Sequence, residues 1–249
     1  MDNTNKFSGK ADVYQQARSS YAPEMLAFIA KTWQIGEGSL VADIGSGTGI
    51  LTRQLLGLGA KVYAVEPNAD MRAKAEELLG GDPNFVSVNG TAEQTNLPDH
   101  NFHLITAAAA FHWFDAVRFK RECERILLPG APVLLAWNDA RLSAEVNRGR
   151  ERIFRKYCPN FQGFSGGKDE NHAIKRAFFD GALRETRFPN PVTYDRQTFI
   201  NRALSASYSL IETDARFQDY LTELGALFDQ YAVDGKIVIP QDSVAFFRG

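Results

Sequence analysis

The stretch Val41-Ala-Asp43-Ile-Gly45-Ser-Gly47-Thr-Gly49 decides the fold, because an apolar run of strand length leads into a turn with a glycine at every second position. Glycine permits the left-handed backbone of a tight turn and lets a ligand approach the main chain closely. A helix that begins at Ile50 would point its first N–H groups and its positive end toward that ligand. The stretch therefore predicts a binding turn between a strand and a helix.

Short apolar runs alternate with helical patterns on both sides of this turn. Such alternation predicts βαβ units and a mostly parallel sheet with helices on both faces, which is a doubly wound α/β fold. We expect one domain over residues 1–249, with N-terminal lid helices over 1–35, including a helical pattern over 11–33, and a binding core over 36–140. The expected core strands are 40–44, 61–65, 85–88, 104–108 and 132–137, and the expected core helices are 50–58, 69–79 and 119–127.

The pattern changes after residue 137, where helical segments dominate. We expect residues 141–180 and 195–235 to form a helical cap over the carboxyl edge of the sheet, where open α/β sheets bind ligands. The arginines between Arg148 and Arg155 predict a solvated helix face, and attraction of an anionic substrate is the alternative. Further expected elements are helices at 141–158, 198–209 and 215–231, a loop at 160–167, and strands at 183–192, 237–239 and 244–247.

The amino-acid composition argues against several classes of binding partner. The 249 residues are 44% hydrophobic and 23% charged with a formal net charge of -2, so no basic excess indicates a nucleic-acid partner. The two cysteines, Cys123 and Cys158, form no metal-binding motif. The polar N-terminus does not resemble a signal peptide, and no apolar run approaches the roughly 20 residues that span a bilayer. We expect a soluble cytoplasmic protein with no metal and no membrane partner.

Glu66 indicates which class of ligand the turn binds. An acidic residue about 20 residues beyond the turn is placed to bind ribose hydroxyls, which indicates an adenosine-bearing ligand. The dinucleotide fingerprint needs a glycine where Ile50 stands, and Asp43 beside the turn would repel a pyrophosphate. S-adenosylmethionine (SAM) carries no phosphate, and its ammonium suits an acid. The pattern therefore favours SAM, with a nicotinamide-dependent oxidoreductase as the disfavoured alternative.

On these motifs the chain resembles the class I SAM-dependent methyltransferases of the small-molecule, type 11 group, and it is similar to their trans-aconitate methyltransferase-like members. The resemblance covers about residues 7–137 and implies a Rossmann-like sheet, mostly parallel, with an antiparallel C-terminal strand and a helical cap. The matching segments are 14–23, 41–49, 65–71, 90–93, 109–115 and 125–130.

The resemblance also implies how the cofactor is held. The backbone of Gly45, Ser46 and Gly47 would line its methionine part, with Asp43 supporting the turn, and Glu66 would bind the ribose hydroxyls. The remaining implied contacts are Asn68 and Met71 beside the ribose and adenine, and Ala92 and Glu93 at the adenine edge.

The reacting end of the cofactor would lie near Ala108 and His112. Tyr14 and Arg18 would close over the cofactor, with Arg18 as a partner for its carboxylate, although Ser19 follows where the family often has proline. His112 is the candidate catalytic base, and simple packing beside Trp113 is the alternative.

The expected reaction is methyl transfer from SAM to a small-molecule acceptor, with oxygen, including a carboxylate, as the expected acceptor atom. A carboxylate acceptor needs no general base, whereas a phenol or hydroxyl acceptor would benefit from one. Two alternatives stay open: a C-methyltransferase acting on a quinone or lipid-like acceptor, and a non-catalytic SAM-binding module. Phe161, Phe164 and Tyr208 are candidates for lining an acceptor pocket, with packing as the other interpretation.

Overall fold

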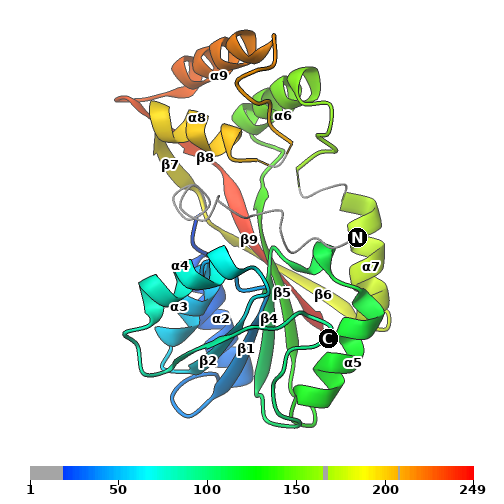
Figure 1. The fold of residues 1–249 in the computed structure, drawn as a ribbon. Coiled ribbons are helices and arrows are strands. Elements are labelled where there is room, and N and C mark those ends of the chain that lie inside the picture. Colours follow the sequence, from blue (N-terminus) through cyan, green and yellow to red (C-terminus); the bar gives the residue numbers. More distant parts are fainter. Residues whose placement is uncertain (1–18, 165–167, 207) are drawn as a thin grey trace.

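The computed structural model of the protein describes residues 19–164, 168–206 and 208–249, and it shows a sheet-based core below a smaller cap (Figure 1). The core sheet has seven strands in the order β3-β2-β1-β4-β5-β9-β6. The pairs among β1 to β5 are parallel, whereas β9 runs antiparallel to both β5 and β6. The strands are β1 (Leu40–Ile44), β2 (Lys61–Val65), β3 (Phe85–Val88), β4 (Leu104–Ala108), β5 (Val133–Ala140), β6 (Leu183–Pro189) and β9 (Gln241–Arg248).

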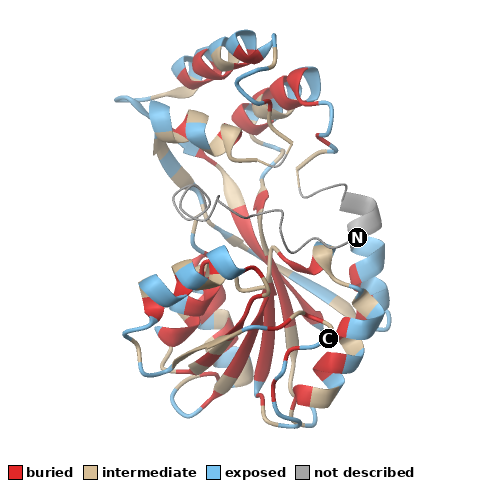
Figure 2. Cartoon of the chain, in the orientation of Figure 1, coloured by how far each residue is buried: buried red, intermediate tan, exposed pale blue. Residues whose placement is uncertain are grey.

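Helices cover both faces of this sheet, which confirms the predicted doubly wound α/β fold. One apolar cluster joins the sheet to α2 (Pro23–Trp33), α3 (Ile50–Leu56) and the end of α4 (Ala69–Leu79). The cluster on the other face joins it to α5 (Ala116–Ile126) and the end of α7 (Lys168–Phe178). Because both faces are covered, the central strands are buried along their length, as Figure 2 shows.

The strand order reverses between β1 and β4, the neighbours at the centre of the sheet. From β1 the chain winds outward through β2 and β3, and it then returns to β4 on the other side. The loops that leave β1 and β4 therefore diverge at the carboxyl edge. A crevice at such a switch point is where open α/β sheets bind their ligands.

The cap has its own apolar cluster, built from α6 (Glu145–Tyr157), α8 (Arg196–Leu204), α9 (Phe217–Tyr231) and a two-stranded sheet. That sheet pairs β7 (Val192–Asp195) with β8 (Lys236–Ile239) in antiparallel register. The cap is joined to the core by the long strands β5 and β9, whose pairing continues to Ala140 and Gln241 (Figure 1).

Several expected elements differ from the observed ones. The expected strand 183–192 is two strands in different sheets: β6 ends at Pro189, and Pro191, which has no N–H to donate to a ladder, lies just before β7. The expected helix 198–209 begins at Arg196 and ends at Leu204. Within the expected cap range 141–180, α7 packs against α5 of the core. The described part of the expected 11–33 helix is α2, which begins at Pro23.

None of the helices in the described ranges is long and apolar enough to cross a membrane.

Candidate functional site

The turn after β1 has three left-handed glycines, Gly45 (φ 65°), Gly47 (φ 58°) and Gly49 (φ 81°). The amides of Gly45 and Ser46 donate to the Val65 carbonyl at 2.8 and 3.2 Å, so the turn is tied to the end of β2. A Cβ on Gly45 would lie 2.7 Å from the Ala110 Cβ, which shows how closely the turn approaches the loop after β4. The geometry therefore requires glycine here for two reasons, backbone conformation and space.

Glu66, directly after β2, is fixed by main-chain groups. Its two carboxylate oxygens accept hydrogen bonds from the N–H groups of Gly47 and Asn68, each at 2.9 Å. Glu66 is only 8% exposed, and burial raises the pKa of its carboxyl, an effect that the two N–H groups and Arg72 oppose. A carboxylate has about four acceptor positions, so two bonds to the main chain leave capacity for ligand hydroxyls.

Asp43 lies at the floor of the turn with no exposed surface. Its carboxylate accepts hydrogen bonds from the hydroxyls of Thr52 on α3, at 2.6 Å, and Thr106 on β4, at 2.7 Å. Burial raises the pKa of Asp43 to about 6, against the opposing effect of the two threonines. Asp43 thus joins the switch-point strands β1 and β4 to the first turn of α3.

Two observations at the turn indicate that a ligand fits there. A Cβ built on Gly47 would meet no atom of the described residues within 4 Å, so among these residues the space above this glycine is open. The buried hydroxyl of Ser46 has no hydrogen-bond partner among the residues that the structure describes. A buried hydroxyl without a partner is unfavourable, and a polar ligand beside the turn would supply one.

The predicted adenine-side residues lie at the start of α4 and in the turn after β3. Asn68 caps α4, because its side-chain oxygen accepts a hydrogen bond from the Met71 N–H at 3.0 Å. Met71 and Ala92 are buried, and the Glu93 carboxylate accepts the N–H of Asp115 at 2.9 Å. The turn at residues 90–93 is thereby linked to the segment that follows β4.

The predicted reacting end lies where β4 ends. Ala108 is the last residue of β4 and is partly exposed, and Ala109 has a left-handed backbone (φ 52°) that turns the chain sharply. His112 follows on the 3-10 helix η1 (Phe111–Trp113), is exposed, and its ring centroid lies 4.6 Å from that of Trp113. The structure thus places His112 at the same carboxyl edge as the glycine turn.

Tyr14 and Arg18 lie outside the described residues, so their predicted closure over the cofactor stays a prediction. The chain just after them is held at the carboxyl edge. The Asn138 amide on β5 donates to the carbonyls of Ser19 and Ser20 at 3.1 and 3.2 Å. The buried Ser243 hydroxyl on β9 accepts the Ala22 N–H at 2.8 Å.

Sequence reasoning missed three residues that shape this site. Thr52 and Thr106 hold Asp43, and Arg72 donates to the carbonyl of Glu66 at 2.9 Å. Arg72 lies four residues after the helix cap Asn68, on the same side of α4, so its reach back to the end of β2 follows from helix geometry. Threonine inside a strand or a helix carries no comparable signal.

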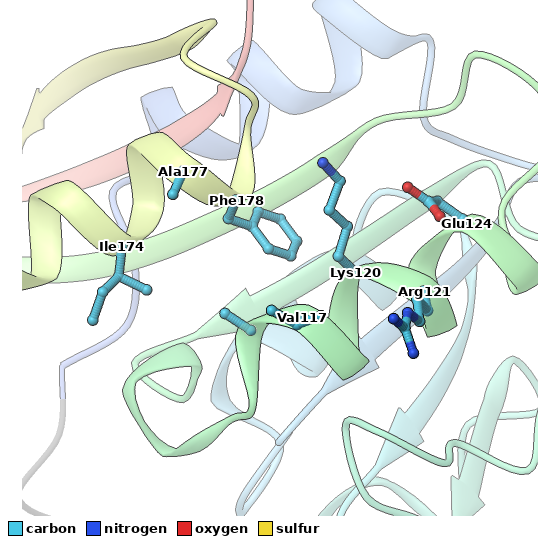
Figure 3. Close-up of a pocket in the computed structure, with 8 residues that line it drawn as sticks. Val117, Lys120, Arg121, Glu124, Ile174, Ala177 and Phe178 are labelled. Carbon is cyan, nitrogen blue, oxygen red and sulfur yellow. The ribbon is translucent and has the colours of Figure 1, made fainter.

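A shallow groove between α5 and α7 lies on the outer surface (Figure 3). Its walls are the exposed side chains of Val117 and Ile174 with Lys120, Arg121 and Phe178. None of the predicted site residues lines this groove, so it is separate from the glycine turn.

Comparison with known families relates the central part of the chain to methyltransferases. Residues 42–135 match the sequence model of the family described as "Methyltransferase domain". Uncharacterized methyltransferases of Mycobacterium tuberculosis and Mycobacterium bovis are 34% identical over 143 residues, which are 57% of this chain and 56% of theirs. An uncharacterized methyltransferase of Schizosaccharomyces pombe is 28% identical over 132 residues, 52% of this chain and 51% of the relative. The match thus spans about half the length of these curated relatives.

Solved structures extend the likeness to the whole fold. A protein from Anaeromyxobacter dehalogenans, provisionally described as a type II methyltransferase, superposes with a TM-score of 0.67 at 19% identity, covering 93% of this chain and 97% of that one. A provisionally described methyltransferase of an antibiotic-biosynthesis pathway from Anabaena variabilis gives 0.60 at 20% identity, covering 94% and 99%. At these identities the likeness concerns the fold, which is the Rossmann-like methyltransferase fold.

Proposed function

We propose that this chain, whose residues 42–135 match a methyltransferase domain of the class I fold, transfers a methyl group from SAM to a small-molecule acceptor. The observation that carries the proposal is the pairing of Glu66 with the open turn. Its buried carboxylate is held by two main-chain N–H groups directly beside the open space at Gly47. A fixed carboxylate with remaining acceptor capacity is suited to the two hydroxyls of a ribose.

Bound SAM would supply a methyl group on a sulfonium, which needs only a nucleophile in line with the bond that breaks. The residues of this chain then act mainly by position and orientation. Glu66 would hold the ribose, the open face at Gly47 would take the methionine part, and the Ser46 hydroxyl would gain a polar partner. Asp43 has no exposed surface, so we assign it a positioning role through the turn in place of direct contact.

We also propose roles for the residues predicted to contact the adenine and the reacting end of the cofactor. We propose that Asn68, Met71, Ala92 and Glu93 line the adenine side, because Glu93 ties that side to the segment carrying His112. Ala108 would border the reacting end of the cofactor. Tyr14 and Arg18 are proposed to close over the cofactor, which the anchoring of Ser19 and Ser20 at the carboxyl edge supports.

We propose oxygen as the acceptor atom, with a carboxylate as the candidate that requires least of the protein. A carboxylate is already ionised at neutral pH, so no residue needs to remove a proton from it. For a phenol or hydroxyl acceptor, His112 is the proposed base, because it is exposed at the carboxyl edge near the end of β4.

The proposal is tested by incubating the protein with methyl-deuterated SAM and a pooled metabolite extract. Mass spectrometry should detect at least one small molecule that gains a deuterated methyl group only when the wild-type protein is present. The Glu66→Gln variant should give much less of the same product. If SAM binds but no labelled product forms with any extract, the chain is a SAM-binding module without this activity.

A further inference from the structure

Arg150 differs from the other arginines of α6. Arg148, Arg152 and Arg155 are exposed, and Arg148 and Arg155 form ion pairs with Glu145 and Glu151 of the same helix. Arg150 is only partly exposed and turns toward the aromatic interior of the cap. The expectation that all these arginines form a solvated face is therefore wrong for Arg150, because a helix with several charges can still bury one of them.

The surroundings of the Arg150 guanidinium are aromatic and neutral. Its Cζ lies 5.0 Å from the Phe164 ring centroid and 5.8 Å from that of Phe154. Its Nη1 donates to the Asn147 side-chain oxygen at 2.9 Å, which uses one of the five N–H bonds of the group. No carboxylate forms an ion pair with Arg150 in the part of the chain that the structure describes.

The pKa of the Arg150 guanidinium is consistent with the lack of an acidic neighbour. Burial lowers the pKa of the Arg150 guanidinium, and the opposing influences come from Tyr208, Tyr194 and Tyr220, not from an acidic residue. A cation in a desolvated position is unfavourable unless an anion compensates it.

Asn147 shows where in the cap the guanidinium lies. Its side chain is fully buried, and its amide donates to the carbonyls of Pro240, at 2.6 Å, and Arg141, at 3.0 Å. These carbonyls lie where β5 leaves the core and β9 enters it. Arg150 is therefore held at the base of the cap, at the junction with the core.

We propose that Arg150 binds a carboxylate or phosphate group of the methyl acceptor, so that the acceptor is an anionic small molecule with a flat or apolar body. A guanidinium binds such oxyanions with two parallel hydrogen bonds, and nearby rings hold it in plane. The partly exposed rings of Phe164 and Tyr208, which pack on the buried ring of Phe161, would supply an apolar wall for that body. The inference rests on the proposed methyl transfer and names the class of acceptor.

The test uses two probes, benzoate for a carboxylate and inorganic phosphate for a phosphate. Each is titrated into the full-length protein with and without S-adenosylhomocysteine, and binding is followed by NMR chemical shifts. Wild type should bind one of the two anions but not the neutral analogue benzamide, and the anion that binds identifies the group. Arg150→Gln should weaken this binding by ten-fold or more. Arg152→Gln removes the same charge from an exposed site on the same helix, so it should leave binding unchanged.

Two further measurements keep the outcome unambiguous. Arg150→Lys retains the charge but not the two parallel hydrogen bonds, and should give intermediate affinity. The melting temperature of Arg150→Gln should equal or exceed that of Arg152→Gln, because an uncompensated charge is removed from the interior. The proposal is overturned if wild type binds neither anion, if Arg150→Gln binds as tightly as wild type, or if Arg150→Gln melts several degrees lower. S-adenosylhomocysteine affinity, measured in the same samples, reports separately on the proposed methyl transfer.

Discussion

Glu66 is the residue on which cofactor binding depends most directly in this account. Replacing its carboxylate by an amide in Glu66→Gln removes a charge-assisted acceptor for the ribose and turns one acceptor into a donor facing an N–H group. A hydrogen bond to a charged group contributes roughly 1.5–3 kcal/mol, so affinity for S-adenosylhomocysteine should fall about 10- to 100-fold. Calorimetric titration measures this, with the exposed Glu77→Gln on α4 as the control. Equal affinities for the two variants would remove Glu66 from the binding site.

Asp43 makes stability depend on pH. Its pKa in the folded protein is about 6, compared with an ordinary value of 3.8, so the folded state keeps this proton at higher pH than the unfolded chain. The resulting stabilisation is complete below pH 3.8 and is lost as pH rises through about 6; it amounts to about 3 kcal/mol.

Asp43→Asn cannot titrate, so the difference in unfolding free energy between variant and wild type should grow in favour of the variant from pH 4 to pH 7. Urea unfolding at several pH values measures this difference, and most other titrating groups cancel in it. A difference that stays constant over this range would show that Asp43 is already ionised at pH 4.

At the scale of elements, the turn between β1 and α3 offers a matched pair of glycines. Gly45 and Gly47 have similar left-handed backbones, so alanine costs about 1–2 kcal/mol at either position through backbone strain. At Gly45 the new Cβ would also lie 2.7 Å from the Ala110 Cβ, whereas at Gly47 it would enter open space.

Gly45→Ala should therefore lower the melting temperature more than Gly47→Ala. Gly47→Ala should fold, yet bind S-adenosylhomocysteine at least ten-fold more weakly, because its methyl group occupies the proposed cofactor space. Thermal unfolding and calorimetry on both variants test this. Unchanged affinity in Gly47→Ala would mean that the cofactor lies elsewhere.

The core elements were predictable because their burial follows a simple pattern. The strands β1 to β4 begin and end as the apolar runs predict. Strand β5 continues beyond Trp137 because Asn138 and Asp139 pair with Ser243 and Asp242 of β9, and pairing between distant segments leaves no local signal. Helix α5 begins at Ala116, since Asp115 caps it, before the first buried position that the periodicity detects.

In the candidate site too, residues with a local sequence signal were predictable, whereas residues placed by tertiary packing were not. Gly45, Gly47 and Glu66 were predictable because glycine spacing and an acid after the second strand are local features. Thr106, which holds Asp43 from 63 positions away, and the inward turn of Arg150 depend on tertiary packing. The cap, in which we propose that the acceptor binds, was for this reason the least predictable part of the chain.

At the scale of the whole molecule, Ser243 on β9 connects the N-terminal segment at Ala22 to β5 and to the loop between β6 and β7. Its fully buried hydroxyl donates to the Asn138 side-chain oxygen at 2.6 Å, and accepts from the Ala22 N–H at 2.8 Å and the Asn190 amide at 3.1 Å. Ser243→Ala would leave the buried Ala22 N–H without that partner, which costs roughly 1–3 kcal/mol.

We expect Ser243→Ala to lower the melting temperature and to weaken S-adenosylhomocysteine binding, because the segment that continues to Arg18 would lose one of its anchors. Ser205→Ala, which removes a hydroxyl at the end of α8 in the cap, is the control and should leave binding unchanged. A loss of stability without any loss of affinity would separate the anchor from the cofactor site.

The central claim is that the turn after β1 and Glu66 bind SAM and not a dinucleotide, and titration calorimetry tests it most directly. Separate titrations of the wild-type protein with SAM and with NADH should give saturable one-to-one binding of SAM and no binding of NADH. Binding of NADH without binding of SAM would contradict the account.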